Sequence, residues 1–157
     1  MNQENTTQVP VPTGHFTVLL SPTPRGARLA RLLAVEWLRE QGVSYGVTEA
    51  ARHIVAELAA NAATHGRVGG RDFRLALLNS PRTLRIEVTD TRAEVLPTLP
   101  IPAPEAESGR GMLLVEALAD RWGVDLGPVP RKTVWAELDV PADRRPEARS
   151  PVARAVS

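Results

Sequence analysis

The sequence predicts an α+β fold, a two-layer sandwich in which a mixed, mainly antiparallel sheet carries three helices on one face. Strand-like segments that follow each other as hairpins, with helical segments between them, predict this arrangement. The 157 residues, 43% of them hydrophobic, can bury one substantial core but are too few for two ordinary domains. We therefore expect one domain over residues 14–140, between tails at 1–13 and 141–157 that hold little to bury.

The first half of the domain predicts one strand and two helices. Residues 15–20 are typical of a strand, and a Ser-Pro-Thr-Pro sequence closes them. Residues 25–41 carry leucines at helical spacing, and the glycine that follows is a usual helix end. A second helix is expected over about residues 48–65, again ended by a glycine.

The second half predicts two hairpins, separated by a proline-rich loop and a third helix. Residues 91–108 show no periodicity and contain four prolines, so we expect neither a helix nor a central strand there. A loop of this length inside a compact domain is uncommon and is often functional. The expected elements are strands at 71–78, 83–90, 122–126 and 132–140 and a helix from Gly109 to about Asp120.

Composition excludes several classes of function. Nineteen basic and eighteen acidic side chains give a net charge of +1, so no bulk field draws the protein to nucleic acid or to an anionic membrane. The absence of cysteine excludes a disulfide framework and a thiolate zinc site. No apolar run approaches the ~20 residues that span a bilayer, and no signal-like segment begins the chain. A cytoplasmic protein is therefore expected.

Glu57 and Asn61 lie one turn apart on the second predicted helix, where they border its apolar arc. A carboxylate and an amide at the edge of a core need partners, which a metal ion with its waters and phosphates would supply. Asn61 could give its side-chain oxygen to Mg²⁺, and Glu57 could take a proton from an attacking hydroxyl or water. An ordinary pair on a helix surface is the alternative interpretation.

Two further features flank the long loop. Asp90 ends an alternating strand, where its carboxylate can accept a hydrogen bond from an exocyclic amine such as that of adenine. Gly109, Arg110 and Gly111 place bare backbone N–H groups where the next helix begins, which suits a phosphate, and Arg110 can add a charge-assisted contact. The ordinary alternatives are a carboxylate at a strand end and a glycine cap at a helix start.

The order of these features resembles the Bergerat-fold ATPase and kinase superfamily, which includes gyrase, Hsp90, histidine kinases and the MutL repair proteins. The resemblance is greatest to the stand-alone anti-sigma-factor serine kinases of actinomycetes, and it covers residues 15–140. It implies that residues 14–140 form an ATP-binding, kinase-like domain. Four blocks carry it: Asn-Ala-Ala-Thr-His-Gly from Asn61, Ser-Gly-Arg-Gly-Met-Leu-Leu-Val from Ser108, Ala-Asp-Arg-Trp-Gly from Ala119 and Lys-Thr-Val-Trp from Lys132.

The resemblance also implies roles for residues that bind nucleotide. The residue at Asn61 holds Mg²⁺ in that family, and the residue at Glu57 acts as the base. By the same resemblance Asp90 binds the adenine amine, and Thr133 supports the adenine site.

The long loop would then be a phosphate lid. In that family the glycines at Gly109 and Gly111 anchor the lid, which here would be residues 91–108. The sequence departs from the family pattern at Arg92 and Arg131, where glycine is usual.

The activity that the resemblance implies is that of an ATP-dependent protein serine/threonine kinase with ATP and Mg²⁺. Such proteins sequester a sigma factor and phosphorylate a small STAS-type anti-anti-sigma protein, whose phosphorylation state decides which partner is bound. The alternative is a module that binds nucleotide or a sigma factor without transferring phosphate. Direct contacts with nucleic acid or a membrane are not expected.

Trp135 suggests a docking surface. Alternation along the last predicted strand places Val134 on the face that the helices cover and Trp135 on the opposite face. An exposed aromatic side chain contributes most to binding if another chain covers it. We therefore expect that the protein self-associates as a homodimer or docks a partner at this surface. The alternative is that the segment after Pro141 folds back over the ring.

Overall fold

The computed structural model describes four segments of the chain. These are residues 13–65, 71–90, 105–127 and 131–141, with the backbone alone described at position 65 and over 105–111. The two predicted tails lie outside these segments except for their innermost residues. None of the helices in the described segments has the length and hydropathy that a bilayer-spanning helix needs.

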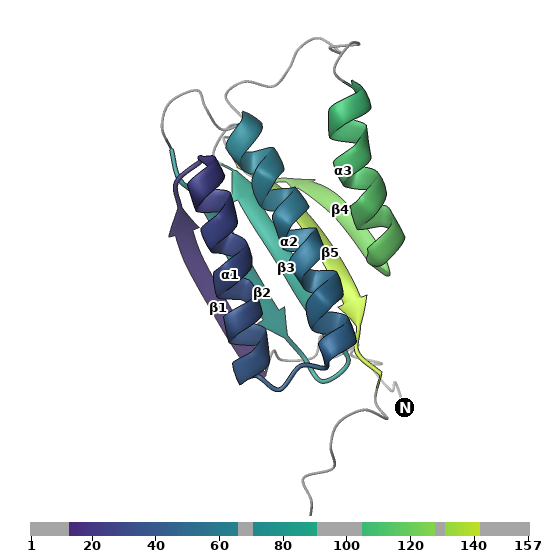
Figure 1. Cartoon of the computed structure of the whole chain (residues 1–157). Helices are drawn as coiled ribbons and strands as arrows, with labels where there is room; N and C mark the ends of the chain where they lie inside the picture. The colour runs from purple at the N-terminus through teal and green to yellow at the C-terminus, as the bar shows by residue number, and fades with distance from the viewer. Residues whose placement is uncertain (1–12, 66–70, 91–104, 128–130, 142–157) are drawn as a thin grey trace, which may run out of the picture.

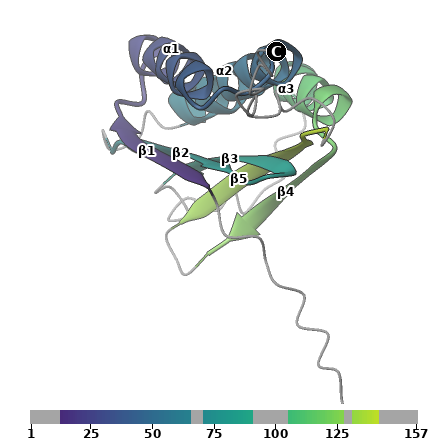
Figure 2. The ribbon, with the colours of Figure 1, turned by 90° about the horizontal axis from the view of Figure 1, so that it is seen from below.

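The fold is a two-layer α+β sandwich, as the sequence predicts. Five strands form one sheet in the order β1-β2-β3-β5-β4, and all three helices of the described segments cover one of its faces (Figures 1 and 2). All four strand pairings are antiparallel, so the described sheet has no parallel pair. The elements are β1 (Gly14–Leu20), α1 (Pro24–Glu40), α2 (Tyr45–His65), β2 (Phe73–Asn79), β3 (Thr83–Asp90), α3 (Glu105–Leu118), β4 (Arg121–Leu126) and β5 (Lys132–Asp139).

The start of α1 depends on a close backbone approach. Thr23 caps the helix, because its Oγ1 accepts a hydrogen bond from the N–H of Gly26 at 3.0 Å. Pro24 occupies the first turn, where a missing N–H costs nothing. A Cβ on Gly26 would lie 1.9 Å from the carbonyl oxygen of Ser21, so only glycine lets α1 begin this close to the end of β1.

The core lies between the helices and one face of the sheet. Alternate residues of β2 and β3 point into it, and α1 and α2 supply the opposing side chains. A continuous core of this kind is where most of the burial free energy of a small domain arises. Its largest fully buried side chains are Phe73, Leu38, Ile54, Leu75, Leu77, Leu84, Ile86, Val55 and Val115.

The opposite face of the sheet is polar around Trp135. The guanidinium of Arg85 lies 4.4 Å from the centre of the Trp135 ring, and Gly123 of β4 lies directly opposite Trp135. A Cβ on Gly123 would come within 2.7 Å of that ring, so the indole packs on the glycine backbone. Trp135 is on the predicted face and is half-buried, with Arg85 and Gly123 against its ring. The self-association or partner docking expected near Trp135, and the alternative of a covering tail, stay predictions.

An ion-pair network continues from Arg85 across the same face. Arg85 contacts Glu87 at 2.7 Å and Glu137 at 3.3 Å, and Arg121 contacts Glu137 at 3.1 Å. Arg121 also hydrogen-bonds Asp139 and holds the pKa of that carboxyl below its usual range. The open face is thus held by charges that solvent can reach.

The third helix begins earlier than predicted. We expected it to open at Gly109, but α3 begins at Glu105, so Gly109, Arg110 and Gly111 lie inside the helix. Glu105, Ala106 and Glu107 are good helix formers, and acidic side chains in a first turn favour the helix dipole. The predicted lid is outside the described residues up to position 104, and its last four residues are helical.

Candidate functional site

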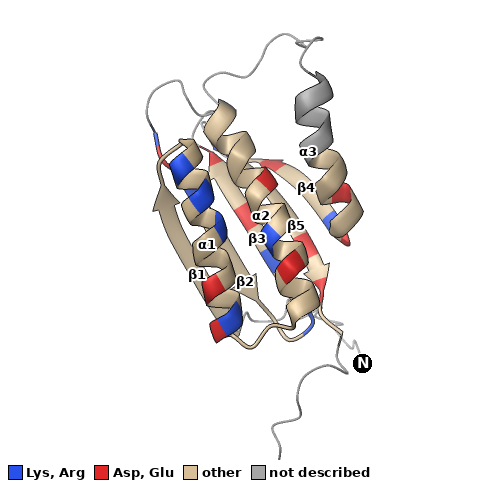
Figure 3. Ribbon diagram, viewed as in Figure 1, with Lys and Arg blue, Asp and Glu red and all other residues tan. Residues whose placement is uncertain are grey.

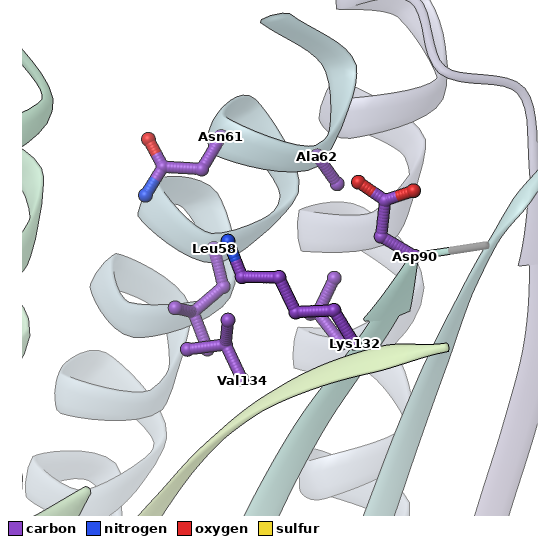
Figure 4. A pocket seen from close by; sticks show the side chains of 7 residues that line it. Leu58, Asn61, Ala62, Asp90, Lys132 and Val134 are labelled. Atoms are coloured by element: carbon purple, nitrogen blue, oxygen red, sulfur yellow. The ribbon is translucent and has the colours of Figure 1, made fainter. Parts of the chain in front are cut away.

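A small pocket opens on the helix-covered face of the sheet, between α2 and the ends of β3 and β5 (Figure 4). Its cavity volume is about 40 Å³. Of the described residues that line it, two are charged and one carries an amide. The lining residues are Leu58, Asn61, Ala62, Val88, Asp90, Lys132 and Val134.

Register explains why the pocket forms at this end of the sheet. Along β3 and β5, the residues that face the helices are apolar over three successive cross-strand pairs. The fourth pair is charged, and it is here that the apolar layer ends and the pocket begins. The four pairs, in order, are Leu84 with Leu138, Ile86 with Ala136, Val88 with Val134 and Asp90 with Lys132.

The helix side of the pocket comes from one stripe of α2. Leu58, Asn61 and Ala62 are spaced three and four residues apart, so they share a face of the helix. Figure 3 shows no charged residue on the C-terminal half of α2, beyond Glu57. The amide nitrogen of Asn61 lies 3.9 Å from the sulfur of Met112 on α3, which places Asn61 between the two helices.

The structure brings together two of the residues predicted from sequence, Asn61 and Asp90, in this pocket. Glu57 is half-buried one turn before Asn61, but it is not among the lining residues. Gly109 and Gly111 lie in the backbone of α3, and the side chain of Arg110 is outside the described residues.

Thr133 is not at the pocket. Its neighbours Lys132 and Val134 both line the pocket, so alternation directs Thr133 to the opposite face of the sheet. There its hydroxyl oxygen is 2.9 Å from that of Thr89, the residue directly opposite on β3. Thr133 therefore links the two strands that carry the pocket residues, from behind.

Lys132 is the pocket residue that sequence reasoning missed. The signal was present, because Val134 is assigned to the helix-covered face and Lys132 has the same parity. In Figure 4 the Lys132 side chain extends from β5 towards α2.

The arrangement can hold a flat polar ligand that also carries negative charge. Leu58, Val88 and Val134 offer an apolar floor, and the Asp90 carboxylate can accept hydrogen bonds at its edge. The Asn61 amide oxygen is a hard ligand of the kind that Mg²⁺ prefers. In the described segments there is no group of three or more His, Asp or Glu side chains that could hold a metal ion.

A model of the histidine kinase-like ATPase domain matches residues 20–137. The chain belongs to this family. The match spans all of α1, α2 and α3 and includes every residue of the pocket, so the pocket lies within the ATPase domain.

Relatives of this ATPase domain are found in sequence and in structure. An uncharacterized protein of Streptomyces coelicolor is 38% identical over 113 residues, which are 70% of this chain and 96% of that protein. The RsbU and RsbW domains of a Mycobacterium tuberculosis protein superpose with a TM-score of 0.62 and 22% identity, over 83% of this chain. This chain spans about a third (34%) of that polypeptide.

The ATPase fold also matches one chain of a solved protein complex. The SiaB–SiaC complex of Pseudomonas aeruginosa superposes with a TM-score of 0.58 and 10% identity, over 78% of this chain and 88% of that one. At these identities the two solved structures support the fold of the domain.

Proposed function

We propose that this ATPase domain binds Mg-ATP between α2, β3 and β5 and is a protein serine/threonine kinase that phosphorylates a small antagonist protein. One observation carries the proposal: Asn61 of α2 and Asp90 of β3, which are far apart in sequence, line a single pocket. Membership of a family of ATPase domains supports the nucleotide. The fold likeness to a structure that contains an RsbW domain supports a kinase of this type.

The adenine ring would be held by apolar contacts and by one carboxylate. A purine ring laid on Leu58, Val88 and Val134 buries apolar surface, and Asp90 at the strand end accepts the hydrogen bond of the exocyclic amine. An ionised carboxylate accepts but does not donate, so it favours adenine, whose 6-amino group donates, over hypoxanthine, whose O6 accepts.

Phosphate transfer would take place on the α2 side. The Asn61 oxygen would ligate Mg²⁺, which neutralises the charge that develops on the phosphates. The serine oxygen attacks the γ-phosphorus as the bond to the β–γ bridging oxygen breaks, so phosphoserine and ADP are the products. Glu57, one turn away on the same helix, would take the serine proton.

A protein substrate is supported by two lines. The sequence blocks resemble kinases that act on a small STAS-type protein and bind a sigma factor. A structural neighbour of this fold was solved as a complex of two proteins, SiaB and SiaC. Mixing the full chain with radiolabelled ATP and STAS-type proteins of the same genome tests the substrate directly.

Nucleotide binding is tested by calorimetry on the full chain. We expect Mg-ATP to bind and to raise the melting temperature, because a ligand of the native state stabilises it by mass action. Asn61→Ala should remove the Mg²⁺ dependence of ATP affinity, and Asp90→Asn should lower the affinity for adenine nucleotides. The absence of a heat signal and of a thermal shift at millimolar Mg-ATP would contradict the proposal.

Transfer is tested separately through Glu57→Gln. This change should leave ATP affinity intact and lower the rate of phosphate transfer about 10²- to 10⁴-fold, as loss of a general base does. Glu49→Gln is the matched control, since Glu49 lies two turns earlier on α2 and pairs with Arg52. If wild-type protein binds ATP and labels no antagonist, the chain is a nucleotide-binding module without kinase activity.

A further inference from the structure

Lys132 gives the pocket a second charged residue, next to Asp90. We infer that Lys132 recognises the phosphates of the bound nucleotide, through its ammonium group. This inference rests on the proposed nucleotide site and adds to it a phosphate contact from the sheet, opposite the one expected from α2.

The position of Lys132 follows from the strand register. Lys132 is the first residue of β5, and it lies directly opposite Asp90, the last residue of β3. Directly opposed residues of antiparallel strands have Cβ atoms about 4.5–5.5 Å apart. A base that is hydrogen-bonded to Asp90 must therefore lie against the Lys132 side chain.

The direction of the Lys132 side chain determines which part of a nucleotide its ammonium group can contact. In Figure 4 the Lys132 chain runs away from the Asp90 carboxylate and towards the helix that carries Leu58 and Asn61. Its methylene groups can then pack along the base, while the charge lies on the side where Asn61 would hold the metal and phosphates. A lysine whose ammonium group contacted the edge of the adenine ring would instead extend beside Asp90.

Charge supports an anionic ligand for this group. In Figure 4 the Lys132 nitrogen points away from the carboxylate of Asp90, its cross-strand neighbour. Glu57, which does not line the pocket, is the one Asp, Glu, Lys or Arg on the described C-terminal half of α2. Lysine supplies three N–H donors and a compact positive charge, which suit phosphate oxygens.

The neighbouring cation provides a matched control. Arg131 is exposed, it precedes Lys132 directly, and it does not line the pocket. Arg131→Gln therefore removes one positive charge from the same end of β5 without changing the lining. Lys132→Met removes the charge and keeps the length of the side chain, and Lys132→Arg keeps the charge.

The test is calorimetric titration of the full chain with adenosine, AMP and ADP. Lys132→Met should lower the affinity for ADP about 10- to 100-fold, which is the range for loss of a hydrogen bond to a charged group. Adenosine affinity should change little, Lys132→Arg should retain most of the ADP affinity, and Arg131→Gln should resemble wild type. Melting temperatures without ligand should match, which shows that each variant is folded.

Salt dependence gives an independent measure with ADP alone. The ADP affinity of wild-type protein should fall with rising salt more steeply than that of Lys132→Met, because one screened charge pair has been removed. Equal losses for adenosine and ADP, unchanged ADP affinity or equal salt dependence would overturn the inference while the nucleotide site stands. If wild-type protein binds none of the three ligands, both the site and the role of Lys132 are refuted.

Discussion

The two faces of β3 differ in how they contact the rest of the domain. On β3, Leu84, Ile86 and Val88 face the helices and are almost inaccessible to solvent, whereas Arg85 and Glu87 on the other face join a network that solvent can reach. The covered face contributes burial, and the pocket begins where its apolar series ends. The open face contributes orientation, because ion pairs and a cation–π contact hold β3, β5 and β4 in register.

This contrast teaches where substitutions should affect stability and where they should affect function. Exposed ion pairs are worth little individually, since solvent and salt screen them. Buried apolar side chains are worth several kcal/mol each. The pocket, at the end of the buried layer, can therefore change its polar residues without loss of the core.

Phe73 offers the strongest test of the contrast. Its ring is 1% exposed on the covered face of β2, and Phe73→Ala should destabilise the domain by about 3–5 kcal/mol, because it removes buried area and leaves a cavity. Arg74→Ala, the next residue on the open face, should change the free energy of unfolding by less than about 0.5 kcal/mol. Urea denaturation measures both. Equal effects of the two substitutions would mean that the faces do not differ as described.

Gly123 tests packing on the open face. Gly123→Ala places a methyl group against the Trp135 ring, so we expect a loss of about 1–3 kcal/mol and a shift in tryptophan fluorescence as the indole moves. Gly46→Ala is the control, because a Cβ there meets nothing within 4 Å. A Gly123→Ala protein as stable as wild type would show that Trp135 does not need the glycine backbone beneath it.

Arg121 should give the smallest effect, one on titration. The hydrogen bonds from Arg121 lower the pKa of Asp139, and a lowered folded-state pKa adds stability that is present above the unfolded pKa and lost as pH falls through the folded value. Arg121→Gln should raise the pKa of Asp139 towards its usual value, and stability should then depend less on acid pH. Carboxyl NMR titration of both proteins measures the change. An unchanged Asp139 pKa would exclude Arg121 as its cause.

Much of the fold could be predicted because the spacing of apolar residues along the sequence follows which side chains are buried. The alternating strand over residues 83–90 was predicted with its observed bounds, since alternate residues on one of its faces are buried as far as Val88. The second helix begins at Tyr45, three residues before the prediction. Ser44 caps its first turn, where it accepts a hydrogen bond from the N–H of Val47 at 3.5 Å, and this cap was overlooked.

The site was predicted less completely than the fold. Asn61 and Asp90 carry motif signals, and they do line one pocket. Lys132 begins one of the four family blocks but was given no role there, and the facing of its strand is what places it in the pocket. The covering of Trp135 by Arg85 and Gly123 depends on which strands are neighbours, and a single sequence does not state that order.

Inserting β5 between β3 and β4 makes the pocket a long-range feature of the chain. Thr89 and Thr133, whose hydroxyls meet behind it, are 44 positions apart, whereas the β2–β3 hairpin closes over a few residues. Loop-closure entropy therefore opposes the pairing that completes the pocket more than it opposes the hairpin. In terms of contact order, the binding surface belongs to the non-local part of the topology, and the rest of the sheet can pair before it exists.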